Sequence, residues 1–232
     1  MARRSTRFEP PDLPAAGAVV TALLRSPATP GEITIKLGRK TAGVISETLA
    51  IQLGIGEGII WTDRTRDAVA GAMLFSIART WAIRTVSRRA MSKSMLISKL
   101  RQRGLDSGPA GRIADELAAS GIIDEKRFAE GIAEVTLARR VFGTRRVSLK
   151  LRAKGITSRT ADEVVDRVAA ESNYDQRAAA LAIAQRKLRS LTRKPDPQAR
   201  QRALYSLLAR RGFDSELCRE VTRTVLGELP DS

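Results

Sequence analysis

Hydrophobic residues recur at steps of three and four along most of this chain, which is the spacing of one face of a helix. From residue 64 onward the pattern predicts nine helices, bounded by polar capping residues and by glycines. Ser107 and Asp124 are the expected caps of the third and fourth of these helices. The nine helices are expected over residues 64–90, 93–103, 109–119, 125–140, 144–154, 159–170, 174–191, 198–211 and 215–226.

The first 62 residues follow a different pattern. Residues 32–37 alternate strictly between polar and apolar, as in a strand that buries one face. A turn at Gly38 would let residues 40–44 pair with that strand. Residues 57–61 can supply a third short strand. This stretch therefore predicts a small sheet ahead of the helices.

One short helix belongs with that sheet. It is expected over residues 47–53, with Ser46 as its cap and Gly54 as its end. Residues 18–62 are therefore interpreted as a small β-hairpin module with one helix. Residues 1–17 are rich in Arg, Pro and Ala, and we expect them to be a disordered basic tail.

Three glycines, Gly104, Gly155 and Gly212, follow stretches that read alike. A leucine stands four residues before each glycine, an apolar residue one after it and a small residue six after it, which is Cys218 in the last case. Apolar positions further from the glycines agree in the same register, which indicates an internal repeat. Glycine suits the left-handed residue that ends a helix, so we assign these three to structure. The sequence thus predicts a mainly α fold of three tandem three-helix repeats behind the β-rich module. The repeats are expected over residues 63–121, 122–172 and 173–232.

The charge of the chain indicates a polyanionic partner. Its 232 residues include 41 Lys and Arg against 25 Asp and Glu, which gives a net charge of +16. The excess lies mainly in the repeats, because residues 71–121 hold nine bases against three acids whereas residues 1–70 are almost balanced. Such an excess favours binding to nucleic acid. A solvated arginine-rich surface without a partner is the alternative.

In the middle repeat the bases gather on the second helix and at the end of the first. Val147 and Leu151 take the inward face of that second helix, so its bases are forced outward, and no acid lies between residues 144 and 159. Few Asn or Gln accompany them, so we expect salt-sensitive contacts with phosphates rather than with base edges. The candidate contact residues are Arg139, Arg140, Arg145, Arg146, Lys150, Arg152 and Lys154, with Arg186, Lys187, Arg210 and Arg211 in the third repeat.

Several classes of protein are disfavoured by what the chain lacks. It has no histidine and one cysteine, which removes the commonest general base, the commonest metal ligand and any disulfide framework. We find no Walker A motif and no nucleophile–base set, so we expect no enzymatic activity, no metal and no cofactor. No apolar run approaches the ~20 residues of a membrane span, and the basic N-terminus lacks a following apolar core. We therefore expect a cytoplasmic protein that does not bind membranes.

Specific runs of sequence then match a known family. The stretch Gly121-Ile-Ile-Asp-Glu-Lys-Arg-Phe-Ala129 is followed by Leu151-Arg-Ala-Lys-Gly-Ile156 and later by Leu208-Ala-Arg-Arg-Gly-Phe213. These runs resemble the signatures of RecX, the bacterial regulators of the recombinase RecA. The chain departs from the family pattern at Glu125, where an Asp is usual. It also departs at residues 91–96, where an arginine and an acid are missing.

This resemblance implies a non-enzymatic modulator of RecA, chiefly an inhibitor. Proteins of this family have three tandem three-helix repeats and bind in the groove of the RecA–single-stranded DNA filament, where they restrain ATP hydrolysis and strand exchange. The resemblance thus implies a role in homologous recombination, DNA repair and the SOS response, and we expect a monomer. The alternative is a helix-turn-helix-like protein that binds duplex DNA without RecA, because three-helix units can dock a helix in a groove.

Overall fold

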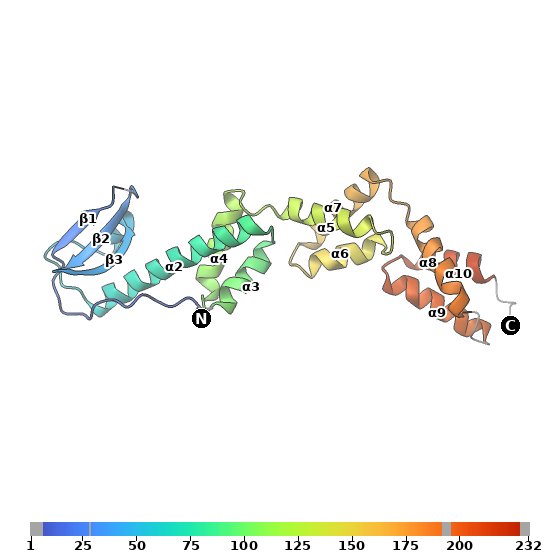
Figure 1. Cartoon of the computed structure of the whole chain (residues 1–232), viewed down its shortest axis with the longest axis horizontal. Coiled ribbons are helices and arrows are strands. Elements are labelled where there is room, and N and C mark those ends of the chain that lie inside the picture. The colour runs from blue at the N-terminus through green and yellow to red at the C-terminus, as the bar shows by residue number, and fades with distance from the viewer. Residues whose placement is uncertain (1–6, 28, 192–195, 228–232) are drawn as a thin grey trace, which may run out of the picture. The chain divides into compact units, whose positions relative to one another are not determined.

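The computed structural model describes residues 7–27, 29–191 and 196–227, and within these ranges it has ten helices and one three-stranded antiparallel sheet (Figure 1). The described residues separate into two compact units. The first takes in those of Met1–Arg89 and Leu96–Ile122, and the second those of Ala90–Met95 and Ile123–Ser232. This architecture confirms the predicted fold class, which is mainly helical with a small β-rich part at the N-terminus.

The sheet of the first unit has the order β1-β2-β3, with β1 at Ala22–Arg25, β2 at Glu32–Leu37 and β3 at Lys40–Ser46. The isoleucines of β2 are buried, and the polar residues between them are half-buried, as the alternation predicted. The short helix α1 (Glu47–Gln52) follows at once, because the Ser46 hydroxyl accepts a hydrogen bond from the Leu49 amide at 3.2 Å.

The prediction of a strand over residues 57–61 is wrong. The third strand is β1, and Ile60 makes only an isolated bridge with Val19. Gly58 adopts a φ of +84° and turns the chain, while Ile59 and Ile60 remain 47% and 59% exposed. The apolar run that follows Gly58 therefore pairs with another segment only at this single bridge and forms no ladder.

The long helix α2 (Asp63–Arg88) crosses β3 and then runs toward α4 (Ser107–Ala119) (Figure 1). It begins in a capping box formed by Thr62 and Thr65. The crossing depends on Gly43, because a Cβ built at this position would collide with the Val69 side chain. The buried Trp61 fills the same core, so sheet and helix share one hydrophobic interior.

Residues 7–17 do not form the disordered tail that was predicted for residues 1–17, of which residues 1–6 lie outside the described residues. They run back along α2 (Figure 1). The indole of Trp61 donates a hydrogen bond to the Pro14 carbonyl at 3.1 Å, and the Phe8 amide donates to the Arg103 carbonyl at 2.7 Å. The Arg103 guanidinium lies 4.9 Å from the Phe8 ring centroid and 4.8 Å from that of Trp81. These aromatic and backbone contacts hold a segment whose composition alone suggested disorder.

After α1, the described residues form nine helices, which match the predicted helices in number and order. Besides α2 and α4, they are α3 (Lys93–Gln102), α5 (Glu125–Leu137), α6 (Thr144–Arg152), α7 (Ser158–Glu171), α8 (Gln176–Leu191), α9 (Pro197–Arg210) and α10 (Ser215–Leu226). Gly104, Gly155 and Gly212 have φ values of +91°, +82° and +84°, which confirms their predicted role at helix ends. The equivalent leucines four residues before them are fully buried, as are the equivalent small residues after them, Cys218 included.

Several predicted helix boundaries are wrong by two or three residues, and two of them concern residues with a predicted role. The N-cap position of α4 is Asp106, and Ser107, the expected cap, is already inside the helix. Helix α5 ends at Leu137 instead of Arg140, because Arg140 takes a left-handed φ of +50°. The cap expected at Asp124 is confirmed, since its carboxylate accepts from the Arg127 amide at 2.9 Å.

Aliphatic cores hold the helices of the second unit. Helices α5, α6 and α7 enclose one cluster around Val147, Leu151 and Val164. Helices α8, α9 and α10 enclose another around Leu204, Leu208 and Val221. Tyr174 packs against both clusters, so it stands where the second and third repeats meet.

Candidate nucleic-acid interface

The loop between α5 and α6 is held by residues of the third repeat. The Tyr174 hydroxyl donates a hydrogen bond to the Phe142 carbonyl at 2.5 Å. The Gln176 side-chain carbonyl accepts from both the amide and the hydroxyl of Thr144, each at 3.2 Å. Because polar backbone groups of this loop are satisfied from outside their own repeat, the loop has a defined conformation.

The end of α9 completes the same contact. The Arg211 guanidinium donates to the Val141 carbonyl at 3.0 Å, and the Arg211 carbonyl accepts from the Gly143 amide at 2.9 Å. We call this set of contacts, between residues 141–146 and residues 174–176 with 211–212, the junction. Arg211 was predicted to bind the filament, but here its half-buried side chain ties two repeats together.

Two glycines allow the backbones to approach closely at the junction. A Cβ built on Gly143 would overlap the Gly212 carbonyl, and one built on Gly212 would overlap the backbone of Arg146. Gly212 was predicted to have a structural role as a helix end. Its contact with Arg146 adds a second reason for glycine that the repeat pattern did not reveal.

The junction brings together six of the predicted contact residues. Each of them stands within two residues of a junction contact, at the end of α5, the start of α6 or the end of α9. Five are exposed, and Arg211 is half-buried. The six are Arg139, Arg140, Arg145, Arg146, Arg210 and Arg211. Guanidinium groups near the N-terminus of α6, where the helix dipole is positive, are the groups that phosphate prefers as partners.

The other predicted contact residues on and just after α6 are engaged by groups of the protein itself. The Lys150 ammonium donates to the Thr136 hydroxyl at 3.0 Å. Arg152 forms an ion pair with Asp162 of α7 at 2.6 Å, which offsets its charge toward an external anion. Lys154 is half-buried, and its carbonyl accepts from the Ser92 hydroxyl. The sequence pattern placed these bases outward but did not show the carboxylate on the neighbouring helix.

Arg186 and Lys187 lie apart from this group. Both are exposed on α8, and the Arg186 Nε donates to the Ala182 carbonyl of its own helix at 3.2 Å. At 1.5 Å per residue they stand about 15 Å along α8 from the junction residue Gln176. The structure therefore does not bring these two bases into the junction cluster.

Burial raises the pKa of Tyr174 to about 12, while the nearby Arg140 guanidinium acts in the opposite direction. The phenol therefore stays protonated at neutral pH and remains a hydrogen-bond donor to the loop. Arg140 directly precedes Val141, whose carbonyl takes part in the junction.

Similarity to known proteins identifies the family. A family model described as the third three-helix domain of RecX matches residues 174–222. The regulatory protein RecX of Chlorobaculum tepidum is 30% identical over 153 residues, which span 66% of this chain and 91% of that protein. The chain belongs to the RecX family. The regulatory RecX proteins of Halorhodospira halophila and Mycobacterium avium are 32% and 30% identical, over 61% and 66% of this chain and 83% and 84% of their own lengths.

Solved RecX structures share the fold. A crystal structure of regulatory protein RecX aligns with a TM-score of 0.66 at 20% identity, covering 88% of this chain and 98% of that chain. RecX from Lactobacillus salivarius aligns with a TM-score of 0.53 at 17% identity, covering 65% and 96%. The resemblance to RecX inferred from the three sequence runs is thus confirmed.

The structure assigns a contact to Glu125, which replaces an Asp of the RecX pattern. Its carboxylate accepts a hydrogen bond from the Lys93 amide at 2.9 Å, so it satisfies an open N–H at the start of α3. The Ser92 hydroxyl accepts from the Met95 amide at 3.2 Å in the same turn. The longer glutamate side chain thus reaches a helix other than its own.

Two further observations concern what a RecX-family protein of this sequence could bind. Among the described residues no three of His, Cys, Asp and Glu lie together as metal ligands. In the same part of the chain, no helix combines the length and the apolar character that crossing a membrane requires.

Proposed function

We propose that this protein is a non-enzymatic regulator, chiefly an inhibitor, of RecA, which binds in the groove of the RecA–single-stranded DNA filament and restrains ATP hydrolysis and strand exchange. Its membership of the RecX family supports this role. The observation that carries it is the junction, where arginines of the turn after α5, the start of α6 and the end of α9 stand on a backbone held by close glycine contacts. We further propose that it acts as a monomer in the cytoplasm.

The junction suits a phosphate backbone better than a base sequence. Its exposed side chains are guanidinium groups from different helices, which can donate paired hydrogen bonds to successive phosphate oxygens. The cluster spans two repeats that are joined by backbone and side-chain hydrogen bonds, so the backbone that carries the charges does not have to be ordered when DNA binds. Preorganisation of this kind reduces the entropic cost of binding. A protein bound in this way would touch DNA and RecA protomers together, which adds multivalent strength.

The proposed function is tested by measuring ATP hydrolysis by RecA on single-stranded DNA with increasing amounts of the protein. We expect inhibition at or below one molecule per RecA protomer. Full ATPase activity at stoichiometric amounts would contradict the proposal. Footprinting on duplex DNA without RecA separates the alternative, because a helix-turn-helix-like protein would protect a defined sequence.

A further inference from the structure

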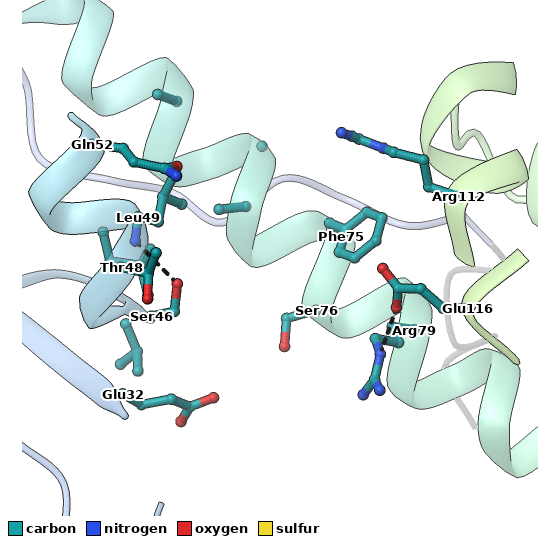
Figure 2. Close-up of a pocket in the computed structure, with 15 residues that line it drawn as sticks. Glu32, Ser46, Thr48, Leu49, Gln52, Phe75, Ser76, Arg79, Arg112 and Glu116 are labelled. Carbon is teal, nitrogen blue, oxygen red and sulfur yellow. Dashed lines mark hydrogen bonds and ion pairs between the residues drawn. The ribbon is translucent and has the colours of Figure 1, made fainter. Parts of the chain in front are cut away.

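An open groove of about 790 Å³ lies in the first unit, away from the arginine junction (Figure 2). Its floor is one face of α2, from Ala68 to Arg79, and its walls come from β3 and α1 on one side and from α4 on the other. No described element of the chain covers this face. The groove uses both the β-rich module and the first repeat, and the proposed DNA contact gives neither of them a role.

The floor of the groove is shaped for a helix. Ala68, Gly71, Ala72 and Phe75 follow one another at steps of three and four along α2. Small residues at such steps let another helix approach to an interaxial distance of about 8–10 Å. Val44, 38% exposed, adds apolar surface to the wall. The floor is about 16 Å long, which corresponds to about three helical turns.

Unpaired charges of opposite sign mark the two ends. The Glu32 carboxylate and the Arg112 guanidinium both reach toward the groove, from β2 and from α4 (Figure 2). Among the described residues neither makes an ion pair, and Arg112 lies 5.3 Å above the Phe75 ring. Arg79 beside it is paired with Glu116 at 3.0 Å. A docked helix would have its positive N-terminal end at Glu32 and its negative C-terminal end at Arg112.

We propose that this groove binds a helix of about three turns, with a small or aliphatic face, displayed by a RecA protomer of the filament. This inference rests on the proposed function and divides it between two surfaces. The junction binds DNA phosphates, and the groove, which has an apolar floor and balanced charges, binds protein. The β-rich module then has a role, since it supplies one wall and the negative end of the groove.

The test uses the full chain and a variant that fills the groove without disturbing the fold. A Cβ at Gly71 would meet nothing within 4 Å, so Gly71→Gln projects a side chain into the groove from a helix interior that favours Gln over Gly. The matched control is Gly131→Gln on α5, where a Cβ also meets nothing. Arg112→Glu is the second groove variant. Arg39→Glu, in the exposed turn between β2 and β3, is its control for charge.

Three quantities are measured for each variant: the concentration that half-inhibits the RecA ATPase on oligo(dT), the affinity for oligo(dT) alone by fluorescence anisotropy, and the melting temperature. We expect Gly71→Gln and Arg112→Glu to raise the half-inhibiting concentration about tenfold or more, while leaving the oligo(dT) affinity within about twofold and the melting temperature unchanged or higher. Both controls should behave as the wild type.

The outcomes separate the two proposals. If the wild type inhibits RecA and both Gly71→Gln and Arg112→Glu inhibit it equally well, the proposal that the groove binds RecA is wrong. The proposed function would then still stand. Absence of inhibition by the wild type would remove both. Sedimentation of the protein without RecA tests another occupant, because a dimer that Gly71→Gln dissociates would show that the groove binds a second copy of this chain instead.

Discussion

Some residues of this protein have a structural role that their sequence pattern does not reveal, and Gly212 is the clearest example. Its φ of +84° is the conformation expected at the end of a helix. A Cβ there would also overlap the backbone of Arg146, which only another repeat can bring near. Gly121 has a similar φ of +72°, but a Cβ there would meet nothing within 4 Å.

This difference predicts the effects of two alanine substitutions. Gly121→Ala introduces only left-handed strain, which costs about 1–2 kcal/mol. Gly212→Ala introduces the same strain and a backbone collision that no side-chain rotation relieves, so it should destabilise the protein further and weaken oligo(dT) binding by disturbing the arginine cluster. Urea unfolding and anisotropy measure the two effects. Equal losses of unfolding free energy in both variants would show that the close approach contributes nothing.

Tyr174 makes a prediction at the same scale. Its pKa is raised from 10.0 to about 12, mainly because the phenol is buried. Since the folded value lies above the unfolded one, its contribution to stability is complete below pH 10 and is lost as the pH rises toward 12. The chain has two tyrosines, so absorbance titration can resolve this step, and Tyr174→Phe should remove it. A titration step near pH 12 that persists in this variant would contradict the assignment.

At the scale of elements, helix α6 holds exposed arginines at a defined place in the second unit. Its buried face holds it in the core of the second repeat, and its first turn is held by the third repeat through Gly143 and Thr144. Arg145 and Arg146 are therefore exposed on a helix end that has little freedom to move. The same helix carries Lys150 and Arg152 one and two turns later, where Thr136 and Asp162 engage them. The start of α6 should consequently contribute more to anion binding than its end.

We predict that the double variant Arg145→Glu/Arg146→Glu loses at least about tenfold in affinity for oligo(dT) at moderate salt, because two phosphate contacts become repulsive. The fold should survive, since both side chains are exposed and neither forms an ion pair with a described residue. The matched control is Lys126→Glu/Arg127→Glu, which changes the net charge equally at the exposed start of α5. If both double variants lose the same affinity, overall charge and not the junction determines binding.

At the scale of the whole molecule, the net charge of +16 is not spread evenly over the two surfaces to which we assign a function. Five exposed arginines gather at the junction of the second unit, whereas the groove in the first unit has charges of both signs. A protein built in this way can hold a nucleoprotein filament through two kinds of contact. The DNA contact should depend strongly on salt, and the protein contact should depend on it much less.

The salt dependence can be stated as a prediction. If each exposed junction arginine neutralises one phosphate of a single strand, the slope of log affinity against log salt is about −3.5. Raising the salt from about 50 to about 200 mM would then reduce the affinity for oligo(dT) about 100-fold. Anisotropy titrations at several salt concentrations give the slope directly. A slope near zero would mean that the arginine cluster does not bind the phosphate backbone.

Local pattern accounts for the helices, their order and the three glycine ends, because periodicity, capping and left-handed residues depend on neighbours within about four positions. The same reasoning identified Arg139, Arg140, Arg145 and Arg146 as exposed bases. It misplaced the third strand, because apolar composition near Ile60 cannot say which segment will lie beside β2. It also treated Arg211 as a contact for the filament, although its guanidinium binds a carbonyl 70 residues away.

The order of elements, the repeat and the excess of positive charge are therefore properties that the amino-acid chain specifies through short-range chemistry. The meeting of Gly143 with Gly212, the pairing of Arg152 with Asp162, the course of residues 7–17 and the groove over α2 arise when distant segments pack. Only the tertiary structure decides these contacts, because the closest approach of two backbones and the burial of a face depend on which surfaces meet. The residues of a single repeat do not determine which other surface will pack against it.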